Sequence, residues 1–356
     1  MRRMVRPSAS FFIIIVLRGL VNMKNKNNIN AKYSKYGYIF IIPFVVVFLI
    51  FSLYPILYTT AVGFTDLKGL GNTQMHLLKD DIFANFKNVL SNGTFQVSMK
   101  NTVKMWVLNF IPQILLALLL TSWFTDKRSK VAGEGFFKII FYMPNIITAA
   151  TVAILFASLF GYPMGPVNDL LARFGFIKAD EPINFFLSKG VAQGVVIFIQ
   201  TWMWYGYTTI NIIAGVNGIS PEIFESAEVD GASRTQTFFQ ITLPNIKTIM
   251  LFILVTSLIG GLNMFDIPKL LVGNSGPDNA TKTTSVFIYD QAFSGSYLYN
   301  RAGAASMIMF VIIVILSAVL FYLMRDKDEA ALKKLAKKQE KMRAAELKAQ
   351  ELLKGV

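Results

Sequence analysis

Long apolar stretches separated by short polar segments run through most of this chain of 356 residues. A helix that crosses the hydrocarbon core of a bilayer needs roughly 20 mainly apolar residues, and about six stretches reach that length. They lie at residues 37–63, 101–124, 137–160, 191–215, 247–272 and 302–324. The pattern predicts an all-α, polytopic membrane protein.

In two of these predicted spans, particular residues indicate where the helix ends or bends. The third is bounded by Lys138 and Pro163, which predicts one crossing between them. The fifth contains Gly260, Gly261 and Pro268. Because proline removes a backbone donor and glycine favours bends, we expect a kink or an unwound turn near the outer end of the fifth span.

Basic residues concentrate in alternate loops between the predicted spans. One set comprises Lys24, Lys26, Lys32, Lys35, Lys127, Arg128, Lys130, Lys138, Arg234, Lys247 and the tail from Arg325. On the opposite side, lysines are offset by acids, as Lys79 is by Asp80 and Asp81. Lysine and arginine favour the cytoplasmic side of a membrane. We therefore predict that both termini are cytoplasmic.

The same pattern divides the chain into three parts. We predict a cytoplasmic tail at 1–35, a transmembrane domain at 36–325 and a basic cytoplasmic helix at 326–356. The opening MRRMVR and FFIIIVL are typical of a signal peptide, but Arg18 ends the apolar run early and no small-residue cleavage site follows. We interpret Met23 as the natural start and 1–22 as an upstream extension; a marginal interfacial segment is the alternative.

Composition supports the membrane class and disfavours several other functions. The chain is 54% hydrophobic and 16% charged, with a net charge of +14. Its basic residues lie in tails and short loops beside apolar runs, so we interpret them as orientation signals and expect no nucleic-acid partner. Cysteine is absent and His76 is the one histidine. Thiolate metal sites and cysteine nucleophiles are thereby excluded, and we expect this chain to bind no metal or cofactor.

The hydrophilic segment at 220–244, SPEIFESAEVDGASRTQTFFQITLP, interrupts the apolar pattern. Ser220 is a favourable N-cap, Pro221 suits the first helical position, and Glu222 complements the positive end of the helix dipole. Gly231 can end this helix because a left-handed conformation costs glycine nothing. The sequence therefore predicts a short helix followed by a turn.

A second short helix is predicted directly after that turn. Ser233 and Gln236 have the spacing of a capping box, and Pro244 closes the segment before the next span. Apolar residues recur at helical spacing on both helices: Ile223, Phe224, Ala227, Phe238, Phe239 and Ile241. Either the protein's own helix ends or a partner must cover this apolar face.

The segment also places an acid, a small residue, a glycine and an I-x-L-P ending at fixed spacing: Glu225, Ala227, Gly231, Ile241, Leu243 and Pro244. This spacing resembles the EAA loop of permease subunits in ATP-binding-cassette importers. Ser226 replaces the first small alanine of the family pattern, and its small size should preserve docking. The resemblance implies a type I importer permease fold.

The resemblance covers most of residues 36–325. Segments similar to sugar-type, binding-protein-dependent permeases are YIFIIPFVVVFLIFSLYPILYTTAVGFTD, FKIIFYMPNIITAATVAILFASLF and NMFDIPKLLVGNSGP, followed by ATKTTSVFIYDQAF. In that family the loop inserts a short helix into a cleft of the ATPase subunit. The resemblance implies that Glu225 anchors this joint, with Gly231 at the turn and Ala227 allowing a close approach. Glu225→Ala should then uncouple transport more than it unfolds the chain.

The chain has no G-x-x-x-x-G-K-[ST] phosphate-binding motif, so ATP must bind elsewhere. The resemblance implies ATP and magnesium on two ATP-binding-cassette ATPase subunits, a second homologous permease subunit and an extracytoplasmic solute-binding protein. It implies import of a carbohydrate across a bacterial cytoplasmic membrane. This chain is then a pore-forming subunit and not an enzyme.

Polar and aromatic residues inside the predicted spans are candidates for a substrate path: Asn109, Gln113, Gln200, Trp202, Trp204, Tyr205, Asn211, Asn263 and Asp266. Sugar hydroxyls need hydrogen-bond partners and sugar rings pack on aromatic faces. The same residue types also join neighbouring helices or lie at lipid interfaces. Asp266 is the sharpest candidate, although Lys269 is near enough in sequence to pair with it.

Two alternatives remain open at this point. A permease for a glycerol-phosphate or polyol-type solute would share the loop, but an anionic solute should leave a basic cluster in the path. An ion-coupled secondary carrier would need an intramembrane ion or proton site, and acids and histidine are scarce in the predicted spans. The identity of the sugar cannot be derived from this chain alone.

Overall fold

The computed structural model of the protein describes residues 36–70, 74–126, 132–295 and 297–324, together with 335, 339, 340, 342 and 343. Predictions about 1–35 and about most of 326–356 lie outside these residues. The chain forms two compact units, residues 1–61 and 62–356. Each unit is described by itself.

The first unit consists of one apolar helix in its described part. This helix belongs to a helical run over Tyr36–Gly63 that is long and apolar enough to span a membrane, as the sequence predicts. A π-helical turn, η1 (Leu49–Leu53), precedes α2 (Tyr54–Gly63). Pro55 lies just inside α2 and has no N–H to donate, which fits a local change of helical pattern at this point.

The second unit is a helical bundle with short helices at both ends. Its longer helices are α4 (Gly93–Phe124), α5 (Glu134–Ile146), α6 (Ala149–Leu159), α8 (Lys189–Asn217), α12 (Lys247–Leu262) and α15 (Tyr299–Met324). The shorter ones are α3 (Ala84–Ser91), α7 (Pro166–Arg173), α9 (Pro221–Val229), α10 (Arg234–Gln236), α11 (Leu243–Asn245), α13 (Asp266–Leu270) and α14 (Thr284–Phe293). A π-helix, η3 (Thr237–Thr242), joins α10 to α11, and the 3₁₀ turns are η2 (Phe185–Leu187), η4 (Gly273–Ser275) and η5 (Pro277–Asn279).

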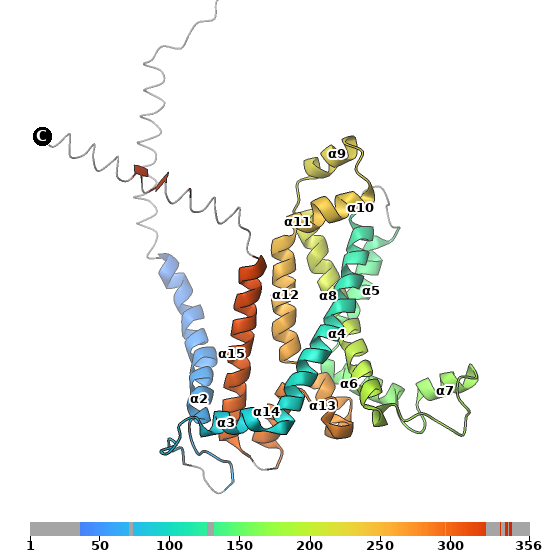
Figure 1. Cartoon of the computed structure of the whole chain (residues 1–356). Coiled ribbons are helices and arrows are strands. Elements are labelled where there is room, and N and C mark those ends of the chain that lie inside the picture. The colour runs from blue at the N-terminus through green and yellow to red at the C-terminus, as the bar shows by residue number, and fades with distance from the viewer. Residues whose placement is uncertain are drawn as a thin grey trace, which may run out of the picture. The chain divides into compact units, whose positions relative to one another are not determined.

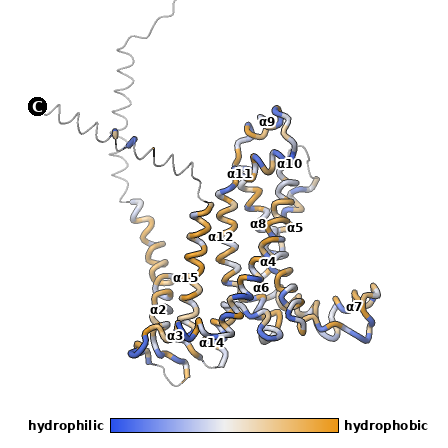
Figure 2. Tube along the Cα trace, viewed as in Figure 1, coloured by the Kyte–Doolittle hydropathy of each residue, from blue (hydrophilic) through white to orange (hydrophobic). Residues whose placement is uncertain are grey.

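Helices α4, α8 and α12 form the centre of this bundle, and α5 packs on α8 while α15 packs on α12 (Figure 1). The segment α9–α11 lies at one end of the bundle, and α3, α13 and α14 lie at the other (Figure 1). Apolar residues dominate the lengths of the long helices between these two ends (Figure 2). The main core cluster joins α4, α6, α8 and α13, with Met105, Val152, Val196, Ile199 and Ile267 fully buried.

Among the described residues, four helices are long and apolar enough to cross a membrane: Tyr36–Gly63, Gly93–Phe124, Lys247–Leu270 and Tyr299–Met324. The bent pair α5 and α6 makes a fifth if it counts as one span. The predicted stretch at 191–215 corresponds to α8, a helix of 29 residues. Helix α8 does not reach the apolarity of the other four because polar residues such as Gln193, Gln200 and Thr208 interrupt it.

The predicted third span is bent, which the sequence pattern did not predict. Helices α5 and α6 meet at an angle of 90°. Thr148 is extended (φ −61°, ψ 139°), and its side chain caps α6 by accepting a hydrogen bond from the Thr151 N–H. A hydropathy average cannot detect this break, because the helices on both sides of Thr148 are apolar.

The fifth span breaks near one end, as predicted, but the glycines are not the break. Helix α12 continues through Gly260 and Gly261 and ends at Leu262, and α13 starts at Asp266. Pro268 is the third residue of α13, where its missing N–H has no intrahelical partner to lose. Gly261 instead allows α12 to lie close to α4, because a Cβ at this position would overlap the indole of Trp106 on α4.

Candidate functional site

The first half of the 220–244 segment folds as its sequence predicts. Helix α9 begins at Pro221, with Ser220 at the N-cap and Glu222 in the first turn. The Ser220 side chain makes no capping hydrogen bond, which departs from the predicted cap. Gly231 has a left-handed φ of 74°. The Ala232 N–H donates to the Ala227 carbonyl at 2.9 Å, and the Gly231 N–H donates to Glu228 at 3.1 Å, so a Schellman motif ends the helix.

The second half contains the predicted capping box and then continues further than expected. Gln236 Oε1 accepts from the Ser233 N–H at 2.9 Å, and Ser233 Oγ accepts from the Gln236 N–H at 3.3 Å. The helical path continues through η3 and α11, so Pro244 lies within it and does not close the segment; the turn comes at Ile246. A π-helix just before Pro244 fits the missing proline N–H, which cannot complete a regular α-helical turn.

The apolar face of this segment is covered only in part. Phe224 and Leu243 pack against a cluster formed by Ala117 on α4, Ile212 and Val216 on α8, and Ile246 and Ile253 around the start of α12. Ala227 is also buried within the chain. In contrast, Ile223, Val229 and Phe239 are exposed. The protein's own helix ends therefore bury one part of this face, and the rest stays open.

The remaining residues of the predicted loop motif are more accessible. Glu225 and Ser226 are exposed, and Ser226 Oγ donates to the Glu222 carbonyl at 2.8 Å. Gly231 is exposed and has open space around it, Ile241 is half-buried, and Pro244 is exposed. Within the described part of the chain, Glu225 makes no hydrogen bond or ion pair.

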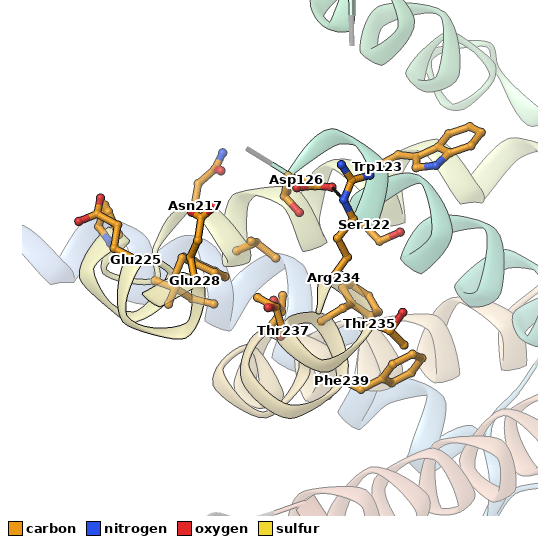
Figure 3. Close-up of a pocket in the computed structure, with 17 residues that line it drawn as sticks. Ser122, Trp123, Asp126, Asn217, Glu225, Glu228, Arg234, Thr235, Thr237 and Phe239 are labelled. Atoms are coloured by element: carbon orange, nitrogen blue, oxygen red, sulfur yellow. Dashed lines mark hydrogen bonds and ion pairs between the residues drawn. The ribbon is translucent and has the colours of Figure 1, made fainter. Parts of the chain in front are cut away.

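A cavity of about 460 Å³ lies between this segment and the ends of α4 and α8. Its lining includes Trp123, Asp126, Phe224, Glu225 and Arg234. Asp126 and Arg234 form an ion pair in this lining, with 3.0 Å between the carboxylate and Arg234 Nε (Figure 3). Glu225 lies away from this pair, on α9 (Figure 3).

A second cavity, of about 420 Å³, lies between α4, α8, α12 and the start of α13. Six of the nine residues proposed for a substrate path line it: Asn109, Gln113, Gln200, Trp204, Asn263 and Asp266. They come from α4, from α8 and from the stretch between the end of α12 and the start of α13. The structure thus brings together residues that only their type had linked.

Other polar and aromatic residues of this cavity were missed: Trp106, Tyr207, Thr208, Thr256 and Ser257. Gln113 Nε2 donates to Thr208 Oγ1 at 2.7 Å, and Trp106 Nε1 donates to Ser257 Oγ at 3.2 Å. Their spacing along the helices could have identified these residues from the sequence. Residues 106, 109 and 113 lie on one face of α4, and residues 200, 204, 207 and 208 lie on one face of α8.

Trp202, Tyr205 and Asn211 lie outside this lining. Tyr205 packs on Phe141 of α5, with ring centroids 5.9 Å apart, and Trp202 packs on Phe156 of α6 at 5.6 Å. The Asn211 amide donates to the Tyr207 carbonyl of its own helix at 2.8 Å. These three residues therefore make contacts within or between helices and do not line the second cavity.

The expected pairing of Asp266 with Lys269 is wrong. Lys269 Nζ lies 2.6 Å from Asp290 on α14, and Lys282 Nζ lies 2.9 Å from the same carboxylate. Burial raises the pKa of Asp290, but hydrogen bonds from these two lysines outweigh it and leave that pKa below its usual 3.8. Asp266 faces the second cavity and has no ion pair within the described residues.

Neither cavity offers a metal site. Across the described ranges, no three His, Cys, Asp or Glu side chains lie close enough together to hold a metal ion. The second cavity instead combines amide, hydroxyl, indole and phenol groups with one carboxylate. Such a set can donate to and accept from an uncharged polar ligand and can pack on its apolar faces.

Comparison with known proteins gives consistent results. The lactose transport system permease protein LacF of Rhizobium radiobacter is 28% identical over 304 residues, covering 85% of this chain and 98% of that protein. The arabinooligosaccharides transport system permease protein AraP of Bacillus subtilis (strain 168) is 28% identical over 292 residues, covering 81% and 87%.

A solved structure shows the same fold. It is the crystal structure of a bacterial alginate ABC transporter in complex with an alginate pentasaccharide-bound periplasmic protein. The likeness has a TM-score of 0.67 at 24% identity and covers 83% of this chain and 95% of the solved one. Residues 102–327 match the family model described as binding-protein-dependent transport system inner membrane component. The chain therefore belongs to the family of inner membrane components of binding-protein-dependent transport systems.

Proposed function

We propose that this chain is the pore-forming permease subunit of an ATP-driven carbohydrate importer. One observation carries the proposal. A loop held by a Schellman motif and a capping box is joined to a helix that lines a polar, aromatic cavity, and its Glu225 is exposed and has no ion pair among the described residues. Family membership and relatives named for lactose and arabinooligosaccharide transport support it. Monosaccharides and oligosaccharides are both compatible with it.

The loop has the properties that a coupling element needs. The Schellman motif and the capping box fix both of its helical parts. Its second part continues into α12, which carries Thr256, Ser257 and Gly261 to the second cavity. A displacement of the loop by a partner would therefore reach the cavity wall as a movement of packed helices, which shift between discrete arrangements. Alternating access is the expected result.

The motif residues take distinct parts in this mechanism. Glu225 and Ser226 would contact a cleft of the ATPase subunit, with Gly231 setting the turn between the loop helices. Ala227 is buried in this chain, so its small side chain lets α9 lie close to the bundle. Leu243 packs against the cluster that contains Ile246 and Ile253 around the start of α12, and Ile241 and Pro244 would help to hold the second part of the loop there.

The second cavity favours an uncharged sugar. Its volume falls within the range of roughly 300–1,000 Å³ that is usual for small-molecule pockets. Trp204 offers a ring face, and Asn109, Gln200 and Asp266 offer groups that bond hydroxyls. Its lining contains one carboxylate and neither lysine nor arginine. A glycerol-phosphate solute would lack a cationic partner there, so an uncharged carbohydrate is the better fit.

The same mechanism implies partners and a location. We propose two ATP-binding-cassette ATPase subunits that bind ATP and magnesium, a second homologous permease subunit and an extracytoplasmic solute-binding protein. The chain would cross the bacterial cytoplasmic membrane several times. Helices α9, α10 and α11, the start of α12 and the end of α15 lie at the same end of the bundle (Figure 1). Arg234 begins α10 and Lys247 begins α12. That end would be cytoplasmic, with both termini on the same side.

A variant of Glu225 tests the coupling role. The complex is purified from native membranes, reconstituted in liposomes and assayed for sugar uptake and ATP hydrolysis, with Glu225→Ala against Glu222→Gln as the control on the same helix. Because Glu225 is exposed and has no ion pair among the residues that the structure describes, we expect the free energy of unfolding to change by less than about 0.5 kcal/mol. Losing one member of an ion pair buried against the ATPase costs about 3–5 kcal/mol. We therefore expect uptake to fall at least about tenfold.

Two results would contradict the proposal in different ways. Full uptake by the Glu225→Ala complex would place the joint elsewhere in the chain. Uptake driven by an ion gradient in liposomes that lack any ATPase subunit would support a secondary carrier and remove the importer assignment.

A further inference from the structure

The end of α4 carries an acid where a helix disfavours one. Helix α4 ends at Phe124, Thr125 is its C-cap, and Asp126 follows directly. The C-terminal end of a helix bears a partial negative charge, so a carboxylate there is unfavourable unless a cation compensates it. The Asp126 side chain is only 18% exposed, which strengthens the need for a partner.

Arg234, which faces this acid, also lies at an unfavourable helix end. It is the first residue of α10, directly after the Ser233 cap, where the partial charge of the helix is positive. Its Nε lies 3.0 Å from an Asp126 carboxylate oxygen. Neither charge suits its own helix, so helix stability does not explain why these residues occupy these positions. The contact between α4 and the loop does.

This contact crosses a hollow part of the molecule. The cavity of about 460 Å³ is lined by residues of α9, α10 and the ends of α4 and α8, and both Asp126 and Arg234 are among them (Figure 3). Phe224 and Leu243 pack on the bundle nearby, and the ion pair joins the loop directly to the end of α4. An ion pair at this position can transmit a movement of the loop to α4.

Helix α4 leads from this contact to the second cavity. It carries Trp106, Asn109 and Gln113, which line that cavity. The end of α4 also contacts α5, because Phe124 lies 6.1 Å from the Phe141 ring, centroid to centroid. The loop thus connects to one cavity wall through α12 and to another through Asp126 and α4.

We propose that Asp126 is a positioning residue for coupling, which ties the loop to α4 through Arg234 so that loop movement displaces both walls of the second cavity. This inference rests on the proposed function. It adds a residue outside the loop motif and assigns it a mechanical role. Since Arg234 is 59% exposed, the pair contributes little to the stability of the fold. We expect loss of this ion pair to change the coupling of ATP hydrolysis to sugar transport.

A double-mutant cycle tests this role. The variants are Asp126→Asn, Arg234→Gln and their combination, purified as the complete complex and reconstituted in liposomes. The measured quantity is sugar transported per ATP hydrolysed. We expect each single variant to lower this ratio about fivefold and the combination to lower it no further, since both remove the same contact. Glu181→Gln is the matched control, because it breaks the exposed Lys178–Glu181 pair of the same 3.0 Å length.

A charge exchange keeps the test valid if a single variant fails to assemble. In Asp126→Lys combined with Arg234→Glu, each charge lies at a favourable helix end, so the pair should form again. We expect at least half of the original ratio of transport to hydrolysis. A cycle in which both single variants keep the full ratio would overturn the inference, and so would an assembled exchange variant that stays uncoupled. Absence of ATP-driven uptake in the unaltered complex would instead overturn the proposed function.

Discussion

The crossing of α12 over α4 gives a sharp test of the second cavity. Gly261 on α12 faces the indole of Trp106 on α4, and an added Cβ would lie 2.6 Å from Trp106 Cγ and 2.9 Å from Nε1. The indole is held in place by its hydrogen bond to Ser257 Oγ at 3.2 Å. Gly261→Ala therefore forces the ring to move, with loss of that bond.

The expected change in the free energy of unfolding for Gly261→Ala has three contributions. Overpacking of a close contact costs about 1–3 kcal/mol. Loss of the indole hydrogen bond costs about 1 kcal/mol. Alanine in place of glycine inside a helix gains about 1 kcal/mol in helix propensity. We expect a net destabilisation of about 1–3 kcal/mol, together with weaker sugar transport because Trp106 lines the cavity.

The neighbouring glycine supplies the control. Gly260 lies in the same helix and has nothing within 4 Å of an added Cβ, so Gly260→Ala should be neutral or slightly stabilising. Thermal unfolding of the detergent-solubilised chain, followed by tryptophan fluorescence, measures both variants. Uptake by the reconstituted complex measures transport. Equal melting temperatures for the two variants, with equal uptake, would refute the reasoning about this contact.

Two further predictions concern helix packing and pH. Gly206→Ala places a Cβ on α8 against the backbone carbonyl of Phe141 on α5, so we expect a loss of about 2 kcal/mol or more in thermal unfolding, whereas Gly194→Ala in open space on the same helix should have no such effect. Asp290→Asn removes a carboxylate whose pKa is below its usual 3.8, a lowering that stabilises the folded state above 3.8. The melting-temperature difference between this variant and the unaltered protein should therefore be present at neutral pH and vanish as pH falls through the lowered pKa; a pH-independent difference would contradict the role of the ionised pair.

Local sequence signals predicted local structure well. The left-handed Gly231 and the Ser233–Gln236 capping box were both read from residues within a few positions of one another, and both are present. These features depend on single-residue conformational preferences and on hydrogen bonds between close neighbours. The apolar helix over Tyr36–Gly63 is likewise a direct consequence of an uninterrupted apolar run.

Features that depend on contacts distant in sequence were predicted less well. Lys269 pairs with Asp290, 21 positions away, and not with Asp266 in its own helix. The choice depends on which distant side chain the fold brings within reach of Lys269. The bend at Thr148 was missed because apolarity continues across it. Residue type alone proposed the substrate path, and it selected Trp202, Tyr205 and Asn211 together with residues that do line the cavity, since only the packing of α4, α8 and α12 decides which faces meet.

The most direct test of the central claim is the identity of the proteins bound to this chain. A tagged chain is isolated from gently solubilised native membranes, and its stoichiometric partners are identified by mass spectrometry. The account predicts an ATP-binding-cassette ATPase and a second permease subunit, with the ATPase reduced or lost in the Glu225→Ala chain. Recovery of the chain alone, or only with copies of itself, would contradict it.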